Sequence, residues 1–154
     1  MQCSVWLCHP RSTGTLTLSS ADPADRPRID FSLFEDERDA EDAARGVEIV
    51  RSIFGQLGLS GYHAGEVSPG PDVVGPNALT TFVRHHGRHG HHPIGTCAMG
   101  NADSAVVDPQ LRVRGVERLW VADASVMPSL ITGHTNAPTV MVAERAADFI
   151  RREA

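Results

Sequence analysis

Residues 92–148 constrain the fold of this 154-residue chain more tightly than any other stretch. A histidine is followed by a run of small residues, two short apolar segments, a second histidine and a helix-like pattern. Gly95 and Gly100 bound the run of small residues, and glycine there permits close backbone approach and positive φ. This order predicts two loops that each present a histidine to a shared site, closed by a helix.

Two short strands are predicted between the histidines. Residues 111–113 alternate in polarity, Arg114 and Gly115 form a turn, and residues 119–122 make a second apolar run. Pro128 ends this region because proline lacks the N–H that a β-ladder needs.

The second histidine, His134, stands just before a predicted helix. Thr135 or Asn136 suits the N-cap, and Pro138 fits the first turn. A helix N-terminus carries free N–H groups and partial positive charge, which favours an electron-rich ring or an anion nearby. The apolar positions that recur at helical spacing, and are therefore expected to be buried, are Val140, Ala143, Ala147 and Ile150.

The ordered series resembles the C-terminal region of the glucose–methanol–choline (GMC) oxidoreductases, flavoenzymes that oxidise alcohols. Their pattern reads H-x-x-G-T-C-x-M-G, V-V-D-x-x-L-R-V-x-G-V, L-x-V-x-D-A-S-x-M-P, and then His or Asn before N-A-P-T and A-E-x-A-A-D. The matching positions are His92, Gly95, Thr96, Cys97, Met99, Gly100, Val106, Val107, Asp108, Leu111, Arg112, Val113, Gly115, Val116, Leu119, Val121, Asp123, Ala124, Ser125, Met127, Pro128, His134, Asn136, Ala137, Pro138, Thr139, Ala143, Glu144, Ala146, Ala147 and Asp148. Before His92 the resemblance is looser.

The resemblance implies roles for two catalytic residues. His92 accepts the proton of the substrate hydroxyl, and His134 beside it bonds the alcohol oxygen, while FAD takes the hydride from carbon. The positions expected to contact FAD are Asp123, Ala124, Thr135, Asn136 and Pro138. A helix N-terminus also suits the negative charge that develops on a reduced flavin.

Upstream, the patterns predict two half-buried strands at residues 9–20 and 28–34, a helix over 36–57 that stops at Gly58, a loop at 60–76, and a short helix at 78–84. The fold class expected is α+β. An antiparallel sheet with packed helices, residues 1–96, forms part of a substrate domain. Residues 97–154 then supply the last strands and helix of a Rossmann-like FAD-binding domain.

The family's G-x-G-x-x-G turn, which follows its first strand, does not occur in this sequence. We therefore expect the chain to be the C-terminal part of a longer enzyme, unable to hold FAD tightly without the missing N-terminal half. The substrate is expected to be a small alcohol. Neither the particular alcohol nor the choice between oxidase and dehydrogenase is legible in these residues.

Composition bears on the partners and the cellular location of the protein. The net charge of −5 and pI of about 5.9 argue against a nucleic-acid surface. There is no apolar run of membrane-spanning length and no signal-peptide pattern. Three cysteines without a C-x-x-C pair indicate free thiols and a cytoplasmic location. Cys97 is expected to be a small buried filler.

One alternative competes with catalysis. Five histidines crowd one short segment, and such clusters can bind zinc or nickel: His85, His86, His89, His91 and His92. Glycines and arginines interleave with them, and no carboxylate or thiolate stands at ligand spacing, so no metal site is predicted. A non-catalytic remnant or a His-rich metal-binding module remains the alternative to the enzyme.

Overall fold

The computed structural model describes residues 1–153, and it divides between Arg88 and His89 into two compact units. The first unit contains β1, β2, α1, a short 3-10 helix η1 (Leu57–Leu59) and α2, and the second contains η2 and α3. Each unit is described by itself. The predicted domain boundary, at residues 96 and 97, stays a prediction.

The only strands among residues 1–153 form a two-stranded antiparallel hairpin, β1 (Thr15–Thr17) and β2 (Arg28–Asp30). Leu16 pairs with Ile29 in the centre of the ladder. The prediction of two half-buried strands was right in place but wrong in burial, because the side chains of Leu16 and Ile29 are 50% and 56% exposed. A hairpin of two three-residue strands is too small to form a broad apolar face, so its apolar side chains stay in contact with solvent.

Helix α1 (Glu37–Phe54) begins where its capping chemistry requires. The Asp36 carboxylate accepts a hydrogen bond from the Arg38 N–H, which satisfies one of the free donors of the first turn. The helix ends at Gly55, whose N–H bonds to the carbonyl of Arg51. The predicted stop at Gly58 was therefore three residues too late, because the chain turns into η1 after Gln56.

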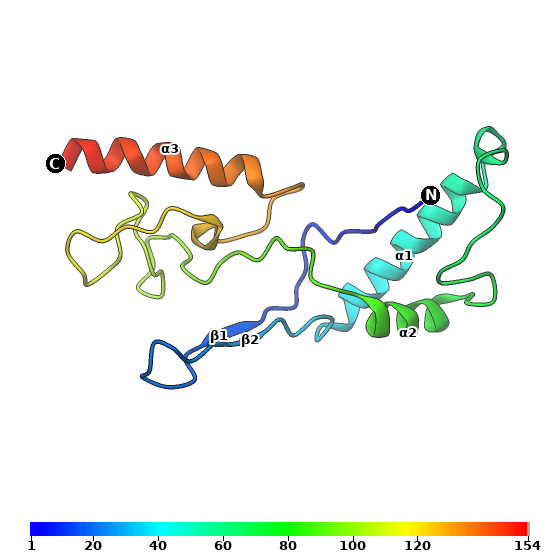
Figure 1. Ribbon diagram of the computed structural model, residues 1–154, viewed down its shortest axis with the longest axis horizontal. Coiled ribbons are helices and arrows are strands. Elements are labelled where there is room, and N and C mark those ends of the chain that lie inside the picture. Colours follow the sequence, from blue (N-terminus) through cyan, green and yellow to red (C-terminus); the bar gives the residue numbers. More distant parts are fainter. Residues whose placement is uncertain (154) are drawn as a thin grey trace. The chain divides into compact units, whose positions relative to one another are not determined.

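Helix α2 (Pro76–His86) has proline at its first position and ends at Gly87. It packs against α1, as Figure 1 shows for the cyan and green helices. Ala43 and Ala44 of α1 meet Leu79 and Val83 of α2, and all four are buried. Small residues on one helix and larger ones on the other let the two helices approach closely.

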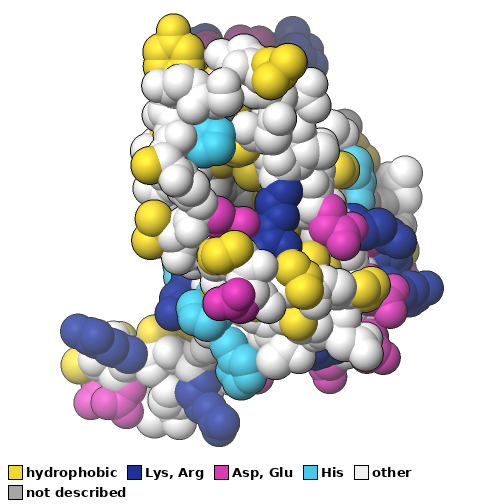
Figure 2. Space-filling model, turned by 90° about the vertical axis from the view of Figure 1, so that its right-hand side faces the viewer, with side chains coloured by type: hydrophobic (Ala, Val, Ile, Leu, Met, Phe, Trp, Pro, Cys, Tyr) yellow, Lys and Arg dark blue, Asp and Glu magenta, His cyan; other side chains and the backbone are white. Residues whose placement is uncertain are grey.

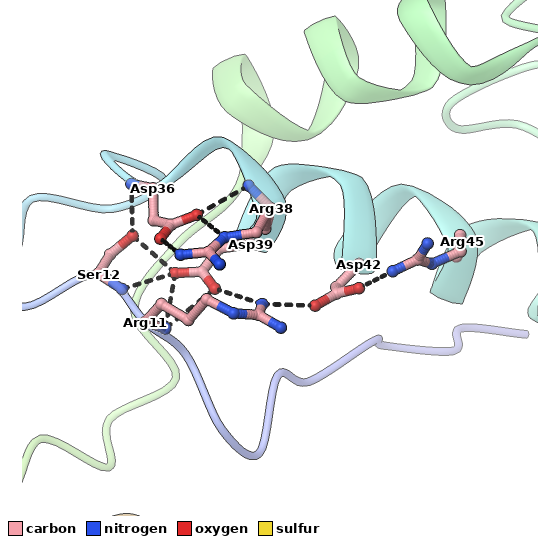
Figure 3. A network of polar contacts seen from close by, with 7 residues as sticks. All are labelled: Arg11, Ser12, Asp36, Arg38, Asp39, Asp42 and Arg45. Atoms are coloured by element: carbon pink, nitrogen blue, oxygen red, sulfur yellow. Dashed lines mark hydrogen bonds and ion pairs between the residues drawn. The ribbon is translucent and has the colours of Figure 1, made fainter.

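A buried carboxylate ties the N-terminal segment to α1 (Figure 3). Asp39 is 2% exposed and accepts bonds from the N–H groups of Arg11 and Ser12 and from the Ser12 hydroxyl. Burial alone would raise the pKa of Asp39, but the bonds from Ser12 and Arg11 together lower it. A charge that is buried and fully hydrogen-bonded fixes the path of the chain before β1.

The second unit is built around helix α3 (Asn136–Glu153) and the loops that pack on it, drawn in red, orange and yellow in Figure 1. Val142 and Ala146 of α3 are buried against Val107, Leu111 and Val126. Cys97, expected to be a buried filler, packs at the edge of this cluster. The two cores account for most of the fully buried side chains in the described chain.

The helix in the second unit buries a different face from the one predicted. Val140 and Ile150 are 54% and 40% exposed, and Ala143 is exposed, whereas Val142 and Ala146 are in the core. Apolar residues occupy almost every side of this helix between residues 140 and 150. Hydrophobic periodicity therefore could not select the buried side.

Isolated bridges replace the two strands expected after His92. Val107 bridges both Met99 and Val113, and Arg112 bridges Trp120. The backbone cannot extend further because Leu111 and Arg118 have positive φ, 66° and 58°, which breaks a ladder on either side. Within residues 97–153 no strand is present, and the Rossmann-like assignment of this part stays a prediction.

Apolar side chains also stand at the surface, and several appear in yellow on the face drawn in Figure 2. The exposed apolar side chains of the described residues include Met141 in α3 and Val116 in the loop before η2, each more than half exposed. None of the helices described here is both long enough and apolar enough to cross a membrane.

Candidate active site

The loop that carries His92 is fastened to the segment around η2 (Ala124–Val126). The N–H of Cys97 bonds to the carbonyl of Ser125 at 3.0 Å, and that of Met99 to Val126 at 2.8 Å. Gly95, with φ of +88°, turns the chain between His92 and this anchored stretch. A side chain at Gly95 would force that left-handed conformation on an L-residue.

The second histidine is positioned by the start of α3. Gly133 has φ of +154° and directs the chain into His134 and Thr135, which immediately precede the helix. The Thr135 carbonyl accepts bonds from both the N–H and the hydroxyl of Thr139, at 3.0 and 2.7 Å. His134 is thus held one residue outside a well-bonded first turn.

The two histidines are in direct contact. His92 Nε2 lies 2.9 Å from His134 Nδ1, and the ring planes meet edge to face with centroids 5.0 Å apart. The other nitrogen of His92, Nδ1, lies 2.7 Å from the hydroxyl oxygen of Thr135. The structure therefore brings together the two residues predicted to be catalytic, and it adds Thr135 as a partner of the first.

This arrangement can accept or release a proton. A hydrogen bond between two imidazole nitrogens needs one N–H and one lone pair, so exactly one hydrogen can lie between Nε2 and Nδ1. His134 is exposed and His92 is partly exposed, which leaves the pair open to a small molecule. A neutral imidazole nitrogen that carries a lone pair can act as a general base toward a hydroxyl proton.

Asp123 and Ala124 lie at η2, which packs against α3. The Asp123 carboxylate accepts bonds from the N–H and the hydroxyl of Ser125, so it caps its own turn. Its side chain is therefore occupied within the loop, and a contact with a cofactor would fall to the backbone here.

The first turn of α3 provides donors that fit a flavin ring. Asn136 and Ala137 are exposed, and the N–H groups of a first helical turn have no intrahelical acceptor. Pro138 is partly buried and brings no N–H to this end. Exposed N–H donors and the positive end of an 18-residue helix suit a group that gains negative charge. The residues present thus fit the pyrimidine side of a flavin.

Other histidines near this pair make local contacts. His86 stacks on Phe82 and bonds to its carbonyl, and His89 meets His91 edge to face. Within residues 1–153 no three His, Cys, Asp or Glu side chains are grouped closely enough to hold a metal ion.

A hollow of about 350 Å³ lies elsewhere in the second unit. It is lined in part by Asp108, Arg112 and Trp120, and neither His92 nor His134 borders it. Arg112 is paired there with Asp108 and Glu153, at 2.8 and 3.0 Å. Glu117 and Arg118 also line it, so the hollow carries charges of both signs.

The partner of His92 in this site was not predicted from the sequence. Thr135 was expected to contact a cofactor, but its side chain is 6% exposed and points to His92. The one signal available was the proline at Pro138, the third helical residue, which removes the N–H that an N-cap threonine usually receives. Without that donor, the hydroxyl of Thr135 is left for another partner.

Comparison with known proteins places these residues in a family. Residues 10–143 match the sequence model of the C-terminal domain of the GMC oxidoreductase family. The chain belongs to the GMC oxidoreductase family. The resemblance read from the sequence is thereby confirmed.

Curated relatives of this GMC oxidoreductase chain are named as dehydrogenases of alcohols or choline. It is 41% identical over 144 residues to alcohol dehydrogenase [acceptor] of Pseudomonas putida, covering 94% of this chain and 26% of the relative. It is 42% identical over 150 residues to oxygen-dependent choline dehydrogenase of Chromohalobacter salexigens, covering 97% and 27%. The chain thus spans about a quarter of the length of the curated relatives it matches.

Solved structures agree with this GMC assignment. A structure of formate oxidase from Aspergillus oryzae, described for its FAD modification, superposes with a TM-score of 0.85 at 30% identity. The match covers 92% of this chain and 25% of that one. The arrangement of helices and loops described above is therefore that of a GMC oxidoreductase C-terminal domain.

Proposed function

We propose that this chain is the substrate- and flavin-facing C-terminal part of an FAD-dependent enzyme that oxidises a small alcohol, with His92 as the base. The observation that carries the proposal is the 2.9 Å contact between His92 Nε2 and His134 Nδ1. Two imidazoles from separate loops converge there beside the start of a long helix. The names of the relatives supply the reaction class, since they are alcohol and choline dehydrogenases.

The alcohol would take the place of the contact between the two rings. A hydroxyl oxygen hydrogen-bonded to both nitrogens needs them about 5 Å apart, since each such bond is about 2.8 Å long. The rings must therefore separate by about 2 Å when substrate enters. His134 is exposed and follows Gly133, and in this proposal its ring is the one that moves.

Each ring then has one task. His92 Nε2 takes the hydroxyl proton as the substrate is oxidised, and His134 keeps a hydrogen bond to the same oxygen. FAD, when bound, supplies the chemistry that accepts the hydride from the carbinol carbon. The departure of the hydroxyl proton to His92 makes that transfer possible, because an alkoxide releases hydride far more readily than an alcohol.

The cofactor-facing residues in this proposal are Asp123, Ala124, Thr135, Asn136 and Pro138. Asp123 and Ala124 would contact FAD through backbone groups, since the Asp123 carboxylate is taken up by Ser125. Thr135 would likewise contribute only backbone, because its hydroxyl is bonded to His92. Support for the set comes from its location on two elements, η2 and α3, that pack against each other.

Anaerobic mixing of the FAD-loaded enzyme with alcohols tests the proposed reaction. We expect a primary alcohol to bleach the oxidised-flavin absorbance, with the matching carboxylate salt as a control that cannot be oxidised in this way. Absence of bleaching across short-chain, aromatic and amino alcohols, with FAD demonstrably bound, would contradict the proposal. That outcome would favour the non-catalytic alternative.

A further inference from the structure

We infer that the hydroxyl of Thr135 is a positioning group that holds His92 as the tautomer with its proton on Nδ1, leaving the Nε2 lone pair for the substrate. The inference rests on the proposed role of His92 as the base. It adds a residue that orients the base and that neither the family match nor the relatives assign.

Two consecutive residues hold both nitrogens of one ring. Thr135 Oγ1 lies 2.7 Å from Nδ1 of His92, and His134 Nδ1 lies 2.9 Å from its Nε2. Thr135 is 6% exposed, so water cannot readily replace the hydroxyl. The orientation of the His92 ring is therefore fixed by the chain at the start of α3.

The hydroxyl is available to the imidazole because the helix does not use it. An N-cap threonine ordinarily accepts a bond from the N–H two or three residues on. Here the third position is Pro138, which has no N–H, and Thr135 receives no capping bond in the described residues. Only the Thr135 carbonyl is engaged by the helix, through Thr139.

The acceptor role of Thr135 suits the base in both of its states. Before the reaction, Nδ1–H donates to Oγ1 and Nε2 is a lone pair. After His92 takes the substrate proton, both nitrogens carry hydrogen, and Nδ1–H still has its acceptor. A hydroxyl that donated to Nδ1 instead would leave hydrogen on Nε2, and His92 could not accept a proton there.

A neutral hydroxyl orients the ring without adding charge. Loss of the outer partner of a metal-bound histidine costs about 10- to 100-fold, whereas the wrong tautomer in a catalytic triad costs about 10⁴-fold. We expect Thr135→Val, which keeps the volume and removes the hydroxyl, to slow flavin reduction by about 10- to 100-fold. Thr135→Ser should restore most of the rate.

The chain offers a matched control one turn further along the helix. Thr139→Val also removes a helical threonine hydroxyl, one bonded to the Thr135 carbonyl rather than to His92. We expect it to leave the tautomer of His92 unchanged. If Thr135→Val does not fold, judged by its thermal transition, Thr135→Ala replaces it as the variant without the hydroxyl.

The decisive readout is the tautomer rather than the rate. NMR of the protein with isotope-labelled histidine nitrogens distinguishes Nδ1–H from Nε2–H, and the signal of His92 is the one lost in His92→Gln. We expect Nδ1–H in the parent protein and in Thr135→Ser, and a mixture or Nε2–H in Thr135→Val. An unchanged tautomer in Thr135→Val, or Nε2–H in the parent, overturns the inference.

These results separate the two claims. If His92→Gln slows reduction while Thr135→Val changes neither tautomer nor rate, the base stands and the positioning role falls. If His92→Gln has no effect on reduction, the proposed function falls, whatever the tautomer of His92.

Discussion

Ser12 gives two hydrogen bonds to one oxygen of Asp39, from its N–H at 2.7 Å and from its hydroxyl at 2.6 Å. The two residues lie 27 positions apart, one before β1 and the other in the first turn of α1. The contact joins the N-terminal segment to the helix pair of the first unit. It also makes a buried charge a condition of that unit's stability.

Asp39→Asn should therefore destabilise the protein by about 1.5–3 kcal/mol, the range for hydrogen bonds to a charged group. An amide presents two N–H donors where Ser12 and Arg11 also donate. Urea unfolding measures the change. Asp42→Asn is the control, since Asp42 is partly exposed and its ion pair with Arg11 lies at the surface, where such pairs contribute little to stability. Equal losses in the two variants would contradict the special place of Asp39.

The lowered pKa values of Asp36 and Asp39 predict how the stability of the protein depends on pH. Hydrogen bonds from Arg38 lower the pKa of Asp36 to about 2, and those from Ser12 and Arg11 lower that of Asp39. An unfolded aspartate titrates near pH 3.9. The stabilisation is thus fully present above about pH 4 and is lost as pH falls toward about 2. Urea midpoints over this window should drop, and Asp36→Asn should reduce the slope; equal slopes would speak against the assignment.

Gly95→Ala should cost about 1–2 kcal/mol, because a left-handed residue with a Cβ is strained by that amount. Gly95 has φ of +88°, while the nearest atom to an added Cβ, the Met127 carbonyl oxygen, is 3.7 Å away. The cost is therefore conformational rather than a clash. Gly58→Ala is the control, since Gly58 has neither positive φ nor a neighbour within 4 Å. Thermal unfolding that shifts equally for both would contradict this reading of the loop.

His134→Ala should slow flavin reduction more than His134→Asn does. The side chain at this position is proposed to hold the alcohol oxygen, and an asparagine amide can still donate a hydrogen bond there. Loss of the bond should cost about 1–2 kcal/mol of transition-state binding, or about 10-fold in rate. Stopped-flow reduction of both variants provides the comparison, and an inverted order would remove His134 from the alcohol site.

The sequence predicted what local chemistry controls. The three helices were located, although α2 begins two residues earlier and ends two residues later than the predicted 78–84. The contact of His92 with His134 was anticipated through the resemblance, and the structure brings the rings together.

Other features depended on distant partners. The buried face of α3 was predicted wrongly because the helix itself has apolar residues on most of its sides. The loops that carry Val107 and Val126 pack on Val142 and leave Val140 exposed. The strands expected after His92 became single bridges, since positive φ at Leu111 cannot be read from a leucine. Asp39 was unremarked because its partners, Arg11 and Ser12, lie in another segment.

The most direct test of the central claim is the rate of flavin reduction by alcohol in His92→Ala, measured anaerobically in the FAD-loaded enzyme. With His92 as the base, the rate constant should fall by about 10²–10⁴-fold while FAD stays bound. A rate constant unchanged from that of the parent enzyme would contradict the account.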